Sequence, residues 1–597
     1  MSRQVLTLLA KMPFVKSPLS RRFLVLLLAS MSLALMGAAS AFAAGEANPT
    51  GVTGSFNGEI GEGVDPSTGN VKRVVEDINV AGAVGAYPLK FSRTQNSRSG
   101  NPLGPFGPGG WWHSYQWGLW LRQVNVGGTT CHPPQPDPPY EGSEGQLFFP
   151  DGRIIQLTAE TGRFDPVAGA EGGLLTVAKI DEQNWEARLK DGGTVHFFAP
   201  TVNNCGSFGL YPTKITDPYG QVTNLIYHPE GGRLWKVQEP GGRYLELTYT
   251  TGNVGGQTAN LLSMVQAFDG RGTCTQTVNY QYASINYNYD PFPTGTYGPS
   301  DYLTQVDYDD GTHAYYSYQV PNRYVGLPGF GQPAYGLIKT CRDVRYGGAM
   351  KNIRYQFDTR DSTNPPIGLG QLKAELNYDT DPAISQIIYP PANANAQEYG
   401  TRHEQRADGR QREFHYDGGT GKLLSYTDFK GNPTTMTDSF RQVVTDARNN
   451  PTTIVYNNAW QIFSMEHPDH TVARYHYDQD IYLTSKTDEN GASDGDPAHT
   501  TTYHRDDRHR IDLISYPDGG SESFTFDPWG QVLRHTMTNG ATEIFTYDAR
   551  GLKQTQVAPA TASQPSATTQ FIYYPAASGA NTDRLQQMID PRGNSTS

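Results

Sequence analysis

The sequence predicts an all-β fold built as a long array of short repeats, and three observations lead to this prediction. A stretch near the C-terminal end restates itself after 21 residues. The 597-residue chain holds 65 Gly, 41 Pro, 36 Tyr and 24 Phe, whereas charged residues make up only 18%. This composition favours short strands and turns over helices. Similar units also recur in phase along much of the chain, which is typical of an array whose neighbours supply one another's core.

The clearest repeat lies between Ser521 and Lys553. The matched positions are Phe524 with Phe545, Phe526 with Tyr547, Asp527 with Asp548, and Gly530 with Gly551. Aromatic residues two positions apart lie on the same face of a strand, because strand side chains alternate. An Asp followed three residues later by Gly provides turn-capping chemistry, and Asn539-Gly540 is a favoured hairpin dipeptide. Each unit is therefore predicted to be strand, turn, strand, turn.

The repeated unit resembles the YD repeat of the RHS family, in which Tyr-Asp is followed by Gly, a basic or polar residue, and Leu or Val. Other copies contain Tyr308-Asp309, Phe357-Asp358, Tyr416-Asp417, Tyr456-Asn457 and Tyr477-Asp478. Joining segments recur at Asp217-Pro218, Pro240-Gly241, Pro517-Asp518 and Asp590-Pro591. The resemblance covers about residues 64–597.

The resemblance implies that the repeats wind into a long spiralling β-sheet that closes into a hollow shell. A wide sheet must curve because its strands twist, and wrapping protects its edges. The toxin-bearing members enclose a variable C-terminal effector, and many have a core segment that cleaves itself through an aspartate. This sequence shows no counterpart of that core segment and no non-repeat tail. A β-propeller-like array is the alternative fold, because two 21-residue units match the ~40–45 residues of a four-stranded blade.

Residues 1–43 are predicted to be a signal peptide. Five basic residues precede the apolar run Phe23–Met36, and Ala41-Phe42-Ala43 offers an A-x-A cleavage site. The run has 14 residues, whereas a spanning helix needs ~20, which favours export over an uncleaved anchor. Removing the segment changes the net charge from −12 to −17. Such an acidic chain is a poor candidate for general binding to nucleic acids or anionic membranes.

The rest of the chain divides into three predicted regions. Residues 44–63 are small and polar and form a flexible leader, residues 64–207 a β-rich pre-repeat or plug region, and residues 208–597 a repeat array that stops within an unfinished repeat. Four tryptophans of the plug region are candidate ligand-stacking residues: Trp111, Trp112, Trp117 and Trp120. They either plug one end of the shell, because large aromatic side chains dominate cores, or stack on carbohydrate.

The four cysteines are candidate disulfide residues: Cys131, Cys205, Cys274 and Cys341. They lack C-x-x-C spacing, which argues against a zinc cluster. Export permits disulfides, and four cysteines allow three pairings, among which the sequence does not choose. The alternative is that some remain buried free thiols.

A search for catalytic motifs gives no candidate residue. His403-Glu404 begins like a zinc-protease motif, but Ala407 stands where the second histidine is required. The evenly spaced histidines are His499, His504 and His509. Their Asp and Arg neighbours favour a solvated, charge-paired loop over a metal site.

Acidic residues are likewise interpreted as structural. The segment 488–496 has Ser493 where an EF-hand requires Gly, so it is predicted to be an acidic surface loop. The repeated aspartates, including Asp217, Asp478 and Asp548, are interpreted as turn caps, because a residue present in every unit serves the structure of the unit. The chain is therefore predicted to have no enzymatic activity, no cofactor and no metal.

The predicted function is an exported RHS/YD-type structural shell, secreted or at the cell surface. It would be the carrier part of a polymorphic-toxin-type system of intercellular competition, with an enclosed C-terminal effector outside this chain as its partner. The alternative is a cell-surface or wall-associated adhesion protein that binds glycans or proteins. No nucleic-acid partner is expected, and no membrane span after the signal is removed. The sequence does not identify an effector or a ligand.

Overall fold

The computed structural model describes residues 64–65, 70–80, 82–97, 104–123, 144–160, 163–166, 174–181, 183–199, 206–229, 232–285, 299–319, 337–343, 351–357, 372–377, 383–388, 401–416, 423–438, 441–445, 448–457, 461–478, 482–548, 550–560, 565–575 and 584–596. These ranges contain 41 β-strands and no helix, so the all-β prediction is confirmed. Because they hold no helix, none of them contains a helical segment able to cross a membrane. The predicted signal peptide and leader lie outside the described residues.

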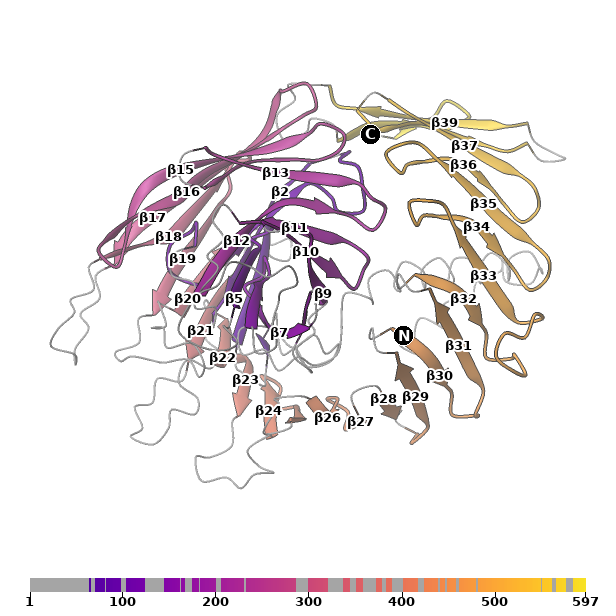
Figure 1. Ribbon diagram of the computed structural model, residues 1–597, viewed down its shortest axis with the longest axis horizontal. Helices are drawn as coiled ribbons and strands as arrows, with labels where there is room; N and C mark the ends of the chain where they lie inside the picture. Colours follow the sequence, from indigo (N-terminus) through magenta and orange to yellow (C-terminus); the bar gives the residue numbers. More distant parts are fainter. Residues whose placement is uncertain are drawn as a thin grey trace.

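The first four strands form a separate antiparallel sheet, here called the inner sheet. Its strands are β1 (Val64–Asp65), β2 (Asn70–Asn79), β3 (Lys90–Asn96) and β4 (Trp111–His113). Figure 1 shows β2 surrounded by the much larger second sheet.

The next eight strands close on themselves, and are here called the ring. They are β5 (Gly118–Gln123), β6 (Glu144–Phe148), β7 (Ile154–Glu160), β8 (Arg163–Pro166), β9 (Leu174–Lys179), β10 (Asn184–Leu189), β11 (Thr194–Phe198) and β12 (Gly206–Thr216). Each pairs with the next, and β12 also pairs with β5. An eight-stranded ring leaves room for side chains alone, and alternate residues such as Leu121, Trp185 and Phe197 are buried.

The predicted boundary between residues 207 and 208 falls inside β12. Residues 206–210 of this strand pair with β5, and residues 214–216 pair with β13. One strand therefore belongs both to the ring and to the repeat array.

From β12 onward, each strand pairs antiparallel with the next one along the chain, in a single sheet here called the wall. Its first half contains β13 (Val222–Tyr227), β14 (Leu234–Gln238), β15 (Tyr244–Val254), β16 (Gln257–Phe268), β17 (Cys274–Ile285), β18 (Ser300–Tyr308), β19 (His313–Gln319), β20 (Leu337–Asp343), β21 (Lys351–Phe357), β22 (Leu372–Asn377), β23 (Ala383–Ile388), β24 (Thr401–Arg406), β25 (Gln411–Tyr416), β26 (Leu423–Thr427) and β27 (Pro433–Asp438). Its second half contains β28 (Arg441–Thr445), β29 (Pro451–Tyr456), β30 (Ile462–Glu466), β31 (Val472–Tyr477), β32 (Leu483–Thr487), β33 (Thr500–Arg505), β34 (Ile511–Ser515), β35 (Ser521–Phe526), β36 (Val532–Thr536), β37 (Thr542–Tyr547), β38 (Lys553–Ala558), β39 (Ala567–Tyr573), β40 (Leu585–Ile589) and β41 (Ser595–Thr596).

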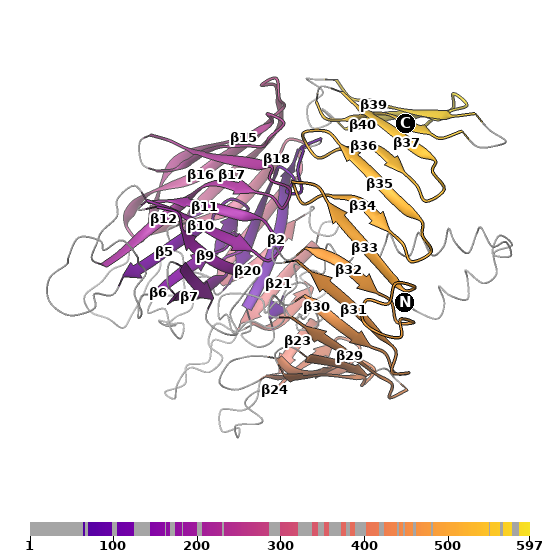
Figure 2. The same ribbon diagram turned by 45° about the vertical axis from the view of Figure 1, so that its right-hand side comes forward.

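The continuous pairing excludes a propeller, in which strands would separate into blades. The wall turns from β12–β19 through β20–β29 to β31–β39, which lie on the other side of the inner sheet (Figures 1 and 2). The fold is therefore the predicted long sheet, wound into a shell.

The repeated aromatic pair has a defined local role. The rings of Phe524 and Phe526 stack at 6.5 Å and 24°, which confirms that they share a face. The second aromatic of each pair sits at a β-bulge, as at Thr546/Tyr547. The Tyr547 hydroxyl donates to the main-chain oxygen of Val532 at 2.9 Å, 15 residues earlier. The same bond at the same separation recurs in Tyr249 to Leu234, Tyr318 to Leu303 and Tyr477 to Ile462.

The aspartate after the bulge caps the following turn. Asp548 Oδ1 accepts hydrogen bonds from the main-chain N–H groups of Arg550 and Leu552, at 2.9 and 3.1 Å. Asp527 makes the equivalent contacts in the preceding repeat. The predicted turn-capping role of the repeated aspartates is confirmed at these positions.

Removing one repeat hydroxyl is expected to have a measurable but local effect. Tyr547→Phe leaves the Val532 oxygen without its donor, which we expect to cost about 1 kcal/mol of unfolding free energy. The control is Tyr503→Phe, because no described carbonyl accepts from the Tyr503 hydroxyl. Urea unfolding should separate the two variants, and equal stabilities would contradict this role of the tyrosine.

The sequence predicts loops for the Gly-rich segment 252–258 and for the low-complexity segment 558–569, but both contain strand residues. Residues 252–258 belong to the β15–β16 hairpin, whose turn is Gly255-Gly256 with φ of 60° and 81°. Positive φ at both central residues is what a two-residue hairpin turn requires, so the glycines mark a tight turn. Residues 567–569 of the predicted low-complexity loop pair with β38 as part of β39.

Candidate functional site

The inner sheet is fixed to the wall by a buried ion pair. Arg93 on β3 donates to Asp77 on β2 through Nε at 2.5 Å and Nη2 at 2.9 Å. Both side chains are 0% exposed. Asp77 stands two residues after the buried Val75, and Arg93 stands two residues after the buried Phe91, so both charges lie within the buried part of the inner sheet.

Three wall tyrosines complete the hydrogen bonding of this pair. Tyr280 on β17 and Tyr308 on β18 donate to the two Asp77 oxygens at 2.8 and 3.0 Å. Arg93 Nη1 donates to the Tyr316 hydroxyl on β19 at 3.2 Å. The guanidinium also lies 5.0 Å from the Trp111 ring centroid and 5.3 Å from that of Tyr316. Buried charges are tolerated only when paired and hydrogen-bonded in this way.

The electrostatics keep Arg93 charged. Burial by itself lowers the pKa of Arg93, but attraction to Asp77 and the tyrosine oxygens raises this pKa well above its usual value. Burial raises the pKa of Tyr280, and the Asp77 charge raises it further, so Tyr280 stays protonated as a donor. The cluster is a structural anchor that joins β2 and β3 of the inner sheet to β17, β18 and β19 of the wall.

Of the four candidate tryptophans, two lie on β4 of the inner sheet, and the other two lie at or just before β5 of the ring. Trp111 is 1% exposed and donates from Nε1 to the Tyr318 hydroxyl at 2.8 Å. Trp112 is 2% exposed and stacks against Phe148 of the ring. A buried ring offers no face to a glycan in this conformation. Trp117 is half-buried against Phe149, and Trp120 is half-buried on β5.

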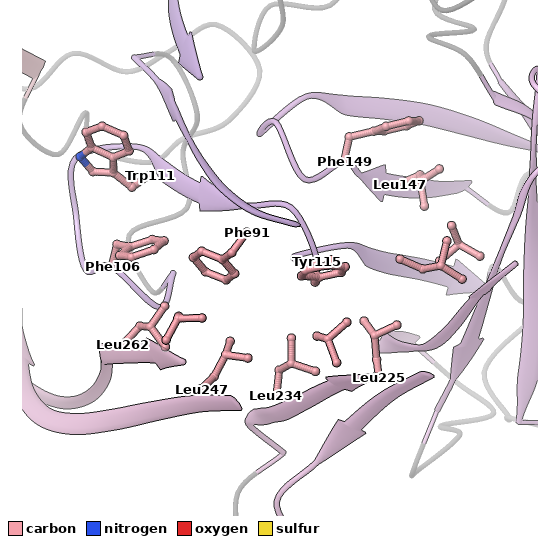
Figure 3. Packing of buried hydrophobic residues seen from close by; sticks show 14 of the residues in the cluster. Phe91, Phe106, Trp111, Tyr115, Leu147, Phe149, Leu225, Leu234, Leu247 and Leu262 are labelled. Carbon is pink, nitrogen blue, oxygen red and sulfur yellow. The ribbon is translucent and has the colours of Figure 1, made fainter. Parts of the chain in front are cut away.

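The other large inner-sheet side chains pack on the wall. Figure 3 shows Phe106, Phe91 and Tyr115 in a row that faces leucines of the early wall strands. Those leucines are Leu225, Leu234, Leu247 and Leu262. Sequence reasoning singled out the tryptophans but missed the Asp77–Arg93 pair, whose guanidinium lies over the Trp111 ring.

The wall face that packs on the inner sheet continues into the late strands. Residues paired directly across neighbouring strands share a face. Following the pairs from Tyr280 strand by strand leads to Phe414 on β25, Tyr475 on β31 and Phe545 on β37. This face is here called the inner face.

The late inner face carries aromatic and apolar residues that are paired across strands with polar and charged ones. The polar and charged members include Lys486, Glu522, His535, Glu543 and Gln556. The aromatic and apolar members between β25 and β40 include Phe414, Tyr426, Ile454, Met465, Tyr475, Tyr503, Ile514, Phe524, Phe545, Phe571 and Met588. The opposite face carries mainly polar residues, including Thr453, Ser464, Arg474, His476, Thr502, His504, Ser523, Arg534, Thr546 and Thr555. Phe524, Phe545 and Phe571 remain half-buried, so no complete second layer of described residues covers them.

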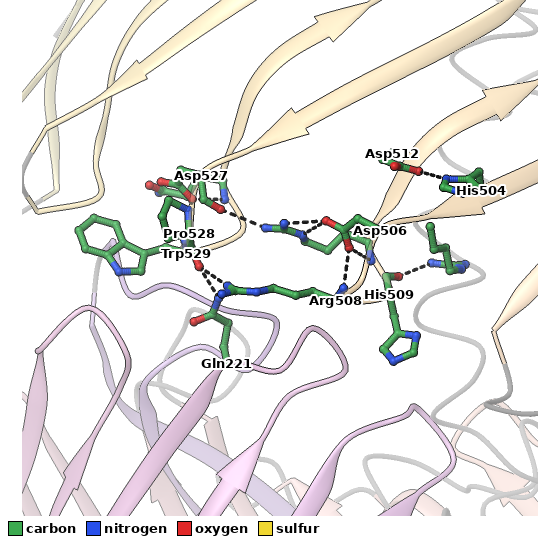
Figure 4. A network of polar contacts seen from close by, with 12 residues as sticks. Gln221, His504, Asp506, Arg508, His509, Asp512, Asp527, Pro528 and Trp529 are labelled. Atoms are coloured by element: carbon green, nitrogen blue, oxygen red, sulfur yellow. Dashed lines mark hydrogen bonds and ion pairs between the residues drawn. The ribbon is translucent and has the colours of Figure 1, made fainter.

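Late turns of the wall meet early turns, at a contact here called the seam. Gln221 Nε2 donates to the Pro528 oxygen at 2.8 Å, and Arg243 Nη2 donates to the Arg550 oxygen. Both contacts join residues 307 positions apart, so two neighbouring early turns contact two neighbouring late turns in the same order. Figure 4 shows Gln221 and Arg508 converging on Pro528. The wall therefore closes on itself through its turns.

The candidate histidines do not form one site. His499 lies 3.2 Å from Asp488, and His504 on β33 lies 2.6 Å from Asp512, whereas the His509 ring stacks on Tyr482. The predicted pairing with carboxylates is confirmed for His499 and His504, but the predicted loop is wrong at His504, because residues 500–505 form β33. In the described ranges, no group of three or more His, Cys, Asp or Glu side chains could hold a metal ion.

The two cysteines within the described residues differ in their exposure to solvent. Cys274 is an exposed free thiol at the start of β17, and Cys341 is buried on β20. Cys131 and Cys205 lie outside the described residues.

Comparison with known proteins gives one family match and several distant structures. Residues 61–135 match a domain of unknown function (DUF6531), which overlaps the inner sheet. No curated protein matches the chain. A Tc holotoxin pore of Photorhabdus luminescens is 12% identical over 75% of this chain and 27% of its own, with a TM-score of 0.31.

Two further structures show weaker similarity. A TcdB2-TccC3 crystal structure is 12% identical over 75% of this chain and 28% of its own, with a TM-score of 0.27. The N-terminal domain of the effector protein SpvB from Salmonella typhimurium strain LT2 is 15% identical over 51% of this chain and 100% of its own, with a TM-score of 0.20. The chain thus spans only about a quarter of the Tc structures that it matches.

Proposed function

We propose that this chain is an RHS/YD-type shell that encloses a polypeptide passenger, as the exported carrier part of a polymorphic-toxin-type system. The observation that carries the proposal is the uncovered inner face. In the early wall this face is covered by the inner sheet, whereas in the late wall the same face presents aromatic side chains that remain half-buried.

Such a surface suits a chain that is not yet folded. Apolar side chains without a covering layer are often used for binding, and the inner face offers separate aromatic contacts with polar and charged residues between them. The other face of the late wall carries mainly polar residues, as a surface in contact with solvent does. The proposal assigns no catalysis to the described residues, and it makes the passenger, outside this chain, the active component.

The proposal is tested with a reporter peptide that contains one cleavage site for a sequence-specific protease. The reporter is fused after Ser597 in one protein and before Ala44 in another, with the predicted signal peptide removed from both. We expect the C-terminal reporter to resist cleavage and the N-terminal reporter to be cut. Equal cleavage of the two reporters would contradict enclosure.

A matched pair of variants assigns any protection to the inner face. Phe524→Ser with Phe545→Ser and Phe571→Ser removes three inner-face rings, and protection should fall. Leu513→Ser with Ile572→Ser removes apolar side chains of the opposite face, which are 37% and 39% exposed, and protection should remain. Loss of protection in both variants would mean that the wall has been destabilised and that the inner face has no special role.

A further inference from the structure

A short segment of the inner sheet lies across the turns of the surrounding strands. Residues 82–87, here called the clasp, belong to the connection from β2 to β3. They contact three successive turns, which join β10 to β11, β12 to β13 and β14 to β15. Each of these turns supplies one carboxylate to the clasp: Asp191, Asp217 and Glu239.

The three carboxylates have divided roles. Asp217 Oδ1 caps its own turn by accepting from the N–H groups of Tyr219 and Gln221, at 2.9 and 2.8 Å. Its second oxygen, Oδ2, accepts from the N–H of Ala86 at 2.5 Å. In the same way, Asp191 Oδ1 accepts from Gly193 N–H at 2.9 Å, and Oδ2 accepts from the Tyr87 hydroxyl at 2.6 Å.

Glu239 makes the third attachment, at the next turn. Its Oε1 accepts from the N–H of Arg243 at 2.9 Å, and its Oε2 accepts from Gly241 at 2.8 Å and from Val84 at 3.2 Å. Glu239 is 2% exposed. A buried carboxylate needs such donors, so the clasp helps to satisfy it.

Turns elsewhere use the second carboxylate oxygen differently. Asp506 Oδ2 binds Arg510, and Asp548 Oδ2 binds Arg550, within the same turn in both cases. Asp590 Oδ2 likewise binds Asn594. In the three early turns, one carboxylate oxygen therefore accepts a hydrogen bond from the clasp. In these late turns, the corresponding oxygen accepts from a side chain of its own turn.

The clasp also contacts the late side of the seam. A Cβ placed on Gly82 would overlap the Leu552 side chain, and Leu552 is buried. A Cβ on Gly551 would lie 3.2 Å from Val84 Cγ1. The clasp is thus held on one side by the carboxylates and packs on the other against the turn 548–552.

We propose that the clasp is a strap that holds the wound wall closed. Its attachment to Asp191, Asp217 and Glu239 keeps the late turns against the early turns, and its release frees the seam while the anchor at Asp77 and Arg93 stays intact. The shell then opens beside the inner sheet. This inference concerns the closure of the wall and stands whether or not a passenger is enclosed.

The test is hydrogen exchange measured by mass spectrometry on the full chain. The variant Asp191→Asn, Asp217→Asn, Glu239→Gln keeps an oxygen to cap each turn but replaces the other with an amide that can donate. We expect amide exchange in 527–531 and 548–552 to rise by roughly tenfold or more, while β17–β19 exchange as before. The matched control is Asp408→Asn, Asp428→Asn, Asp590→Asn, which changes three turn caps for which no contact with the clasp is recorded.

Two outcomes would overturn the inference. The first is faster exchange in the clasp with unchanged exchange in 548–552, because the clasp would then not hold the seam. The second outcome concerns another variant, Gly82→Ala, which is needed if the triple variant exchanges rapidly along its whole length because it fails to fold. Gly82→Ala then decides, since it leaves all three carboxylates and disturbs the clasp at a residue with a φ of 71°, where it packs against Leu552 and the Arg243 guanidinium. An unchanged seam in Gly82→Ala would reject the strap, and a seam loosened alone would support it.

Discussion

Asp77→Asn is expected to lower the unfolding free energy by about 3–5 kcal/mol, because it leaves the Arg93 charge buried without its counter-ion. Arg93→Gln should cost a similar amount for the converse reason. The two effects should not add, because both remove the same interaction, so the double variant should be more stable than the sum predicts. Urea unfolding monitored by tryptophan fluorescence measures all three variants.

An exposed pair on the ring provides the control for this experiment. Arg163 and Asp165 are 3.0 Å apart with side chains 56% and 28% exposed. Exposed pairs contribute about 0–1 kcal/mol, so Asp165→Asn should change stability little. If Asp77→Asn were no more destabilising than Asp165→Asn, the buried pair would not anchor the inner sheet.

Acidification from pH 7 to pH 5 is expected to remove about 2 kcal/mol of stability through His113 alone. This side chain lies on β4, is 3% exposed, and stacks 5.2 Å from Phe91. Burial lowers its pKa from 6.5 to about 3. Its Nδ1 accepts from the N–H of Tyr115 at 3.2 Å, as a neutral imidazole does.

The direction of the effect follows from the two protonation states. Below pH 6.5 the unfolded chain takes up a proton at His113, whereas the folded chain does so only near pH 3. The stabilisation is therefore complete above pH 6.5 and is lost as the pH falls towards 3. Arg93 is the cross-strand neighbour of His113, so a protonated ring would also face a cation.

The variant His113→Gln keeps an acceptor for Tyr115 and removes the titrating group. Its urea midpoint should vary less between pH 7 and pH 5 than that of the unchanged protein. The surface histidine variant His504→Gln is the control and should retain the full pH dependence. An equal pH dependence in His113→Gln and the unchanged protein would show that His113 does not titrate as described.

Local features of the fold could be predicted because their causes lie within one repeat. The spacing of Phe524, Phe526 and Asp527 determines which side chains share a face and where the turn is capped, and the structure shows both. The bulge at the second aromatic was not predicted. The sequence feature that accompanies the bulge is the tyrosine, whose hydroxyl donates to a main-chain oxygen 15 residues earlier. That contact becomes evident only when the two strands are aligned.

Contacts between distant segments could not be predicted, because no local pattern specifies them. Ring closure depends on pairing between β5 and β12, and the seam joins Gln221 to Pro528, 307 residues apart. The Asp77–Arg93 anchor did have a local signal. Asp77 stands two residues after Val75, and Arg93 stands two residues after Phe91 on the neighbouring strand. Opposite charges so close to buried apolar positions of two paired strands indicate a buried pair.

The winding of the wall is tested most directly by one distance, between spin labels at Tyr219→Cys and Trp529→Cys. The labels are placed in a background with all four native cysteines changed to Ala, and the distance is measured by double electron–electron resonance. Strands β13 and β35 are 22 strands apart in sheet order, so an unrolled sheet would separate these turns by roughly 100 Å. A wound wall places the turns in contact, as Gln221 and Pro528 are, and predicts a distance well below half of that value. A distance close to the unrolled value would contradict the shell.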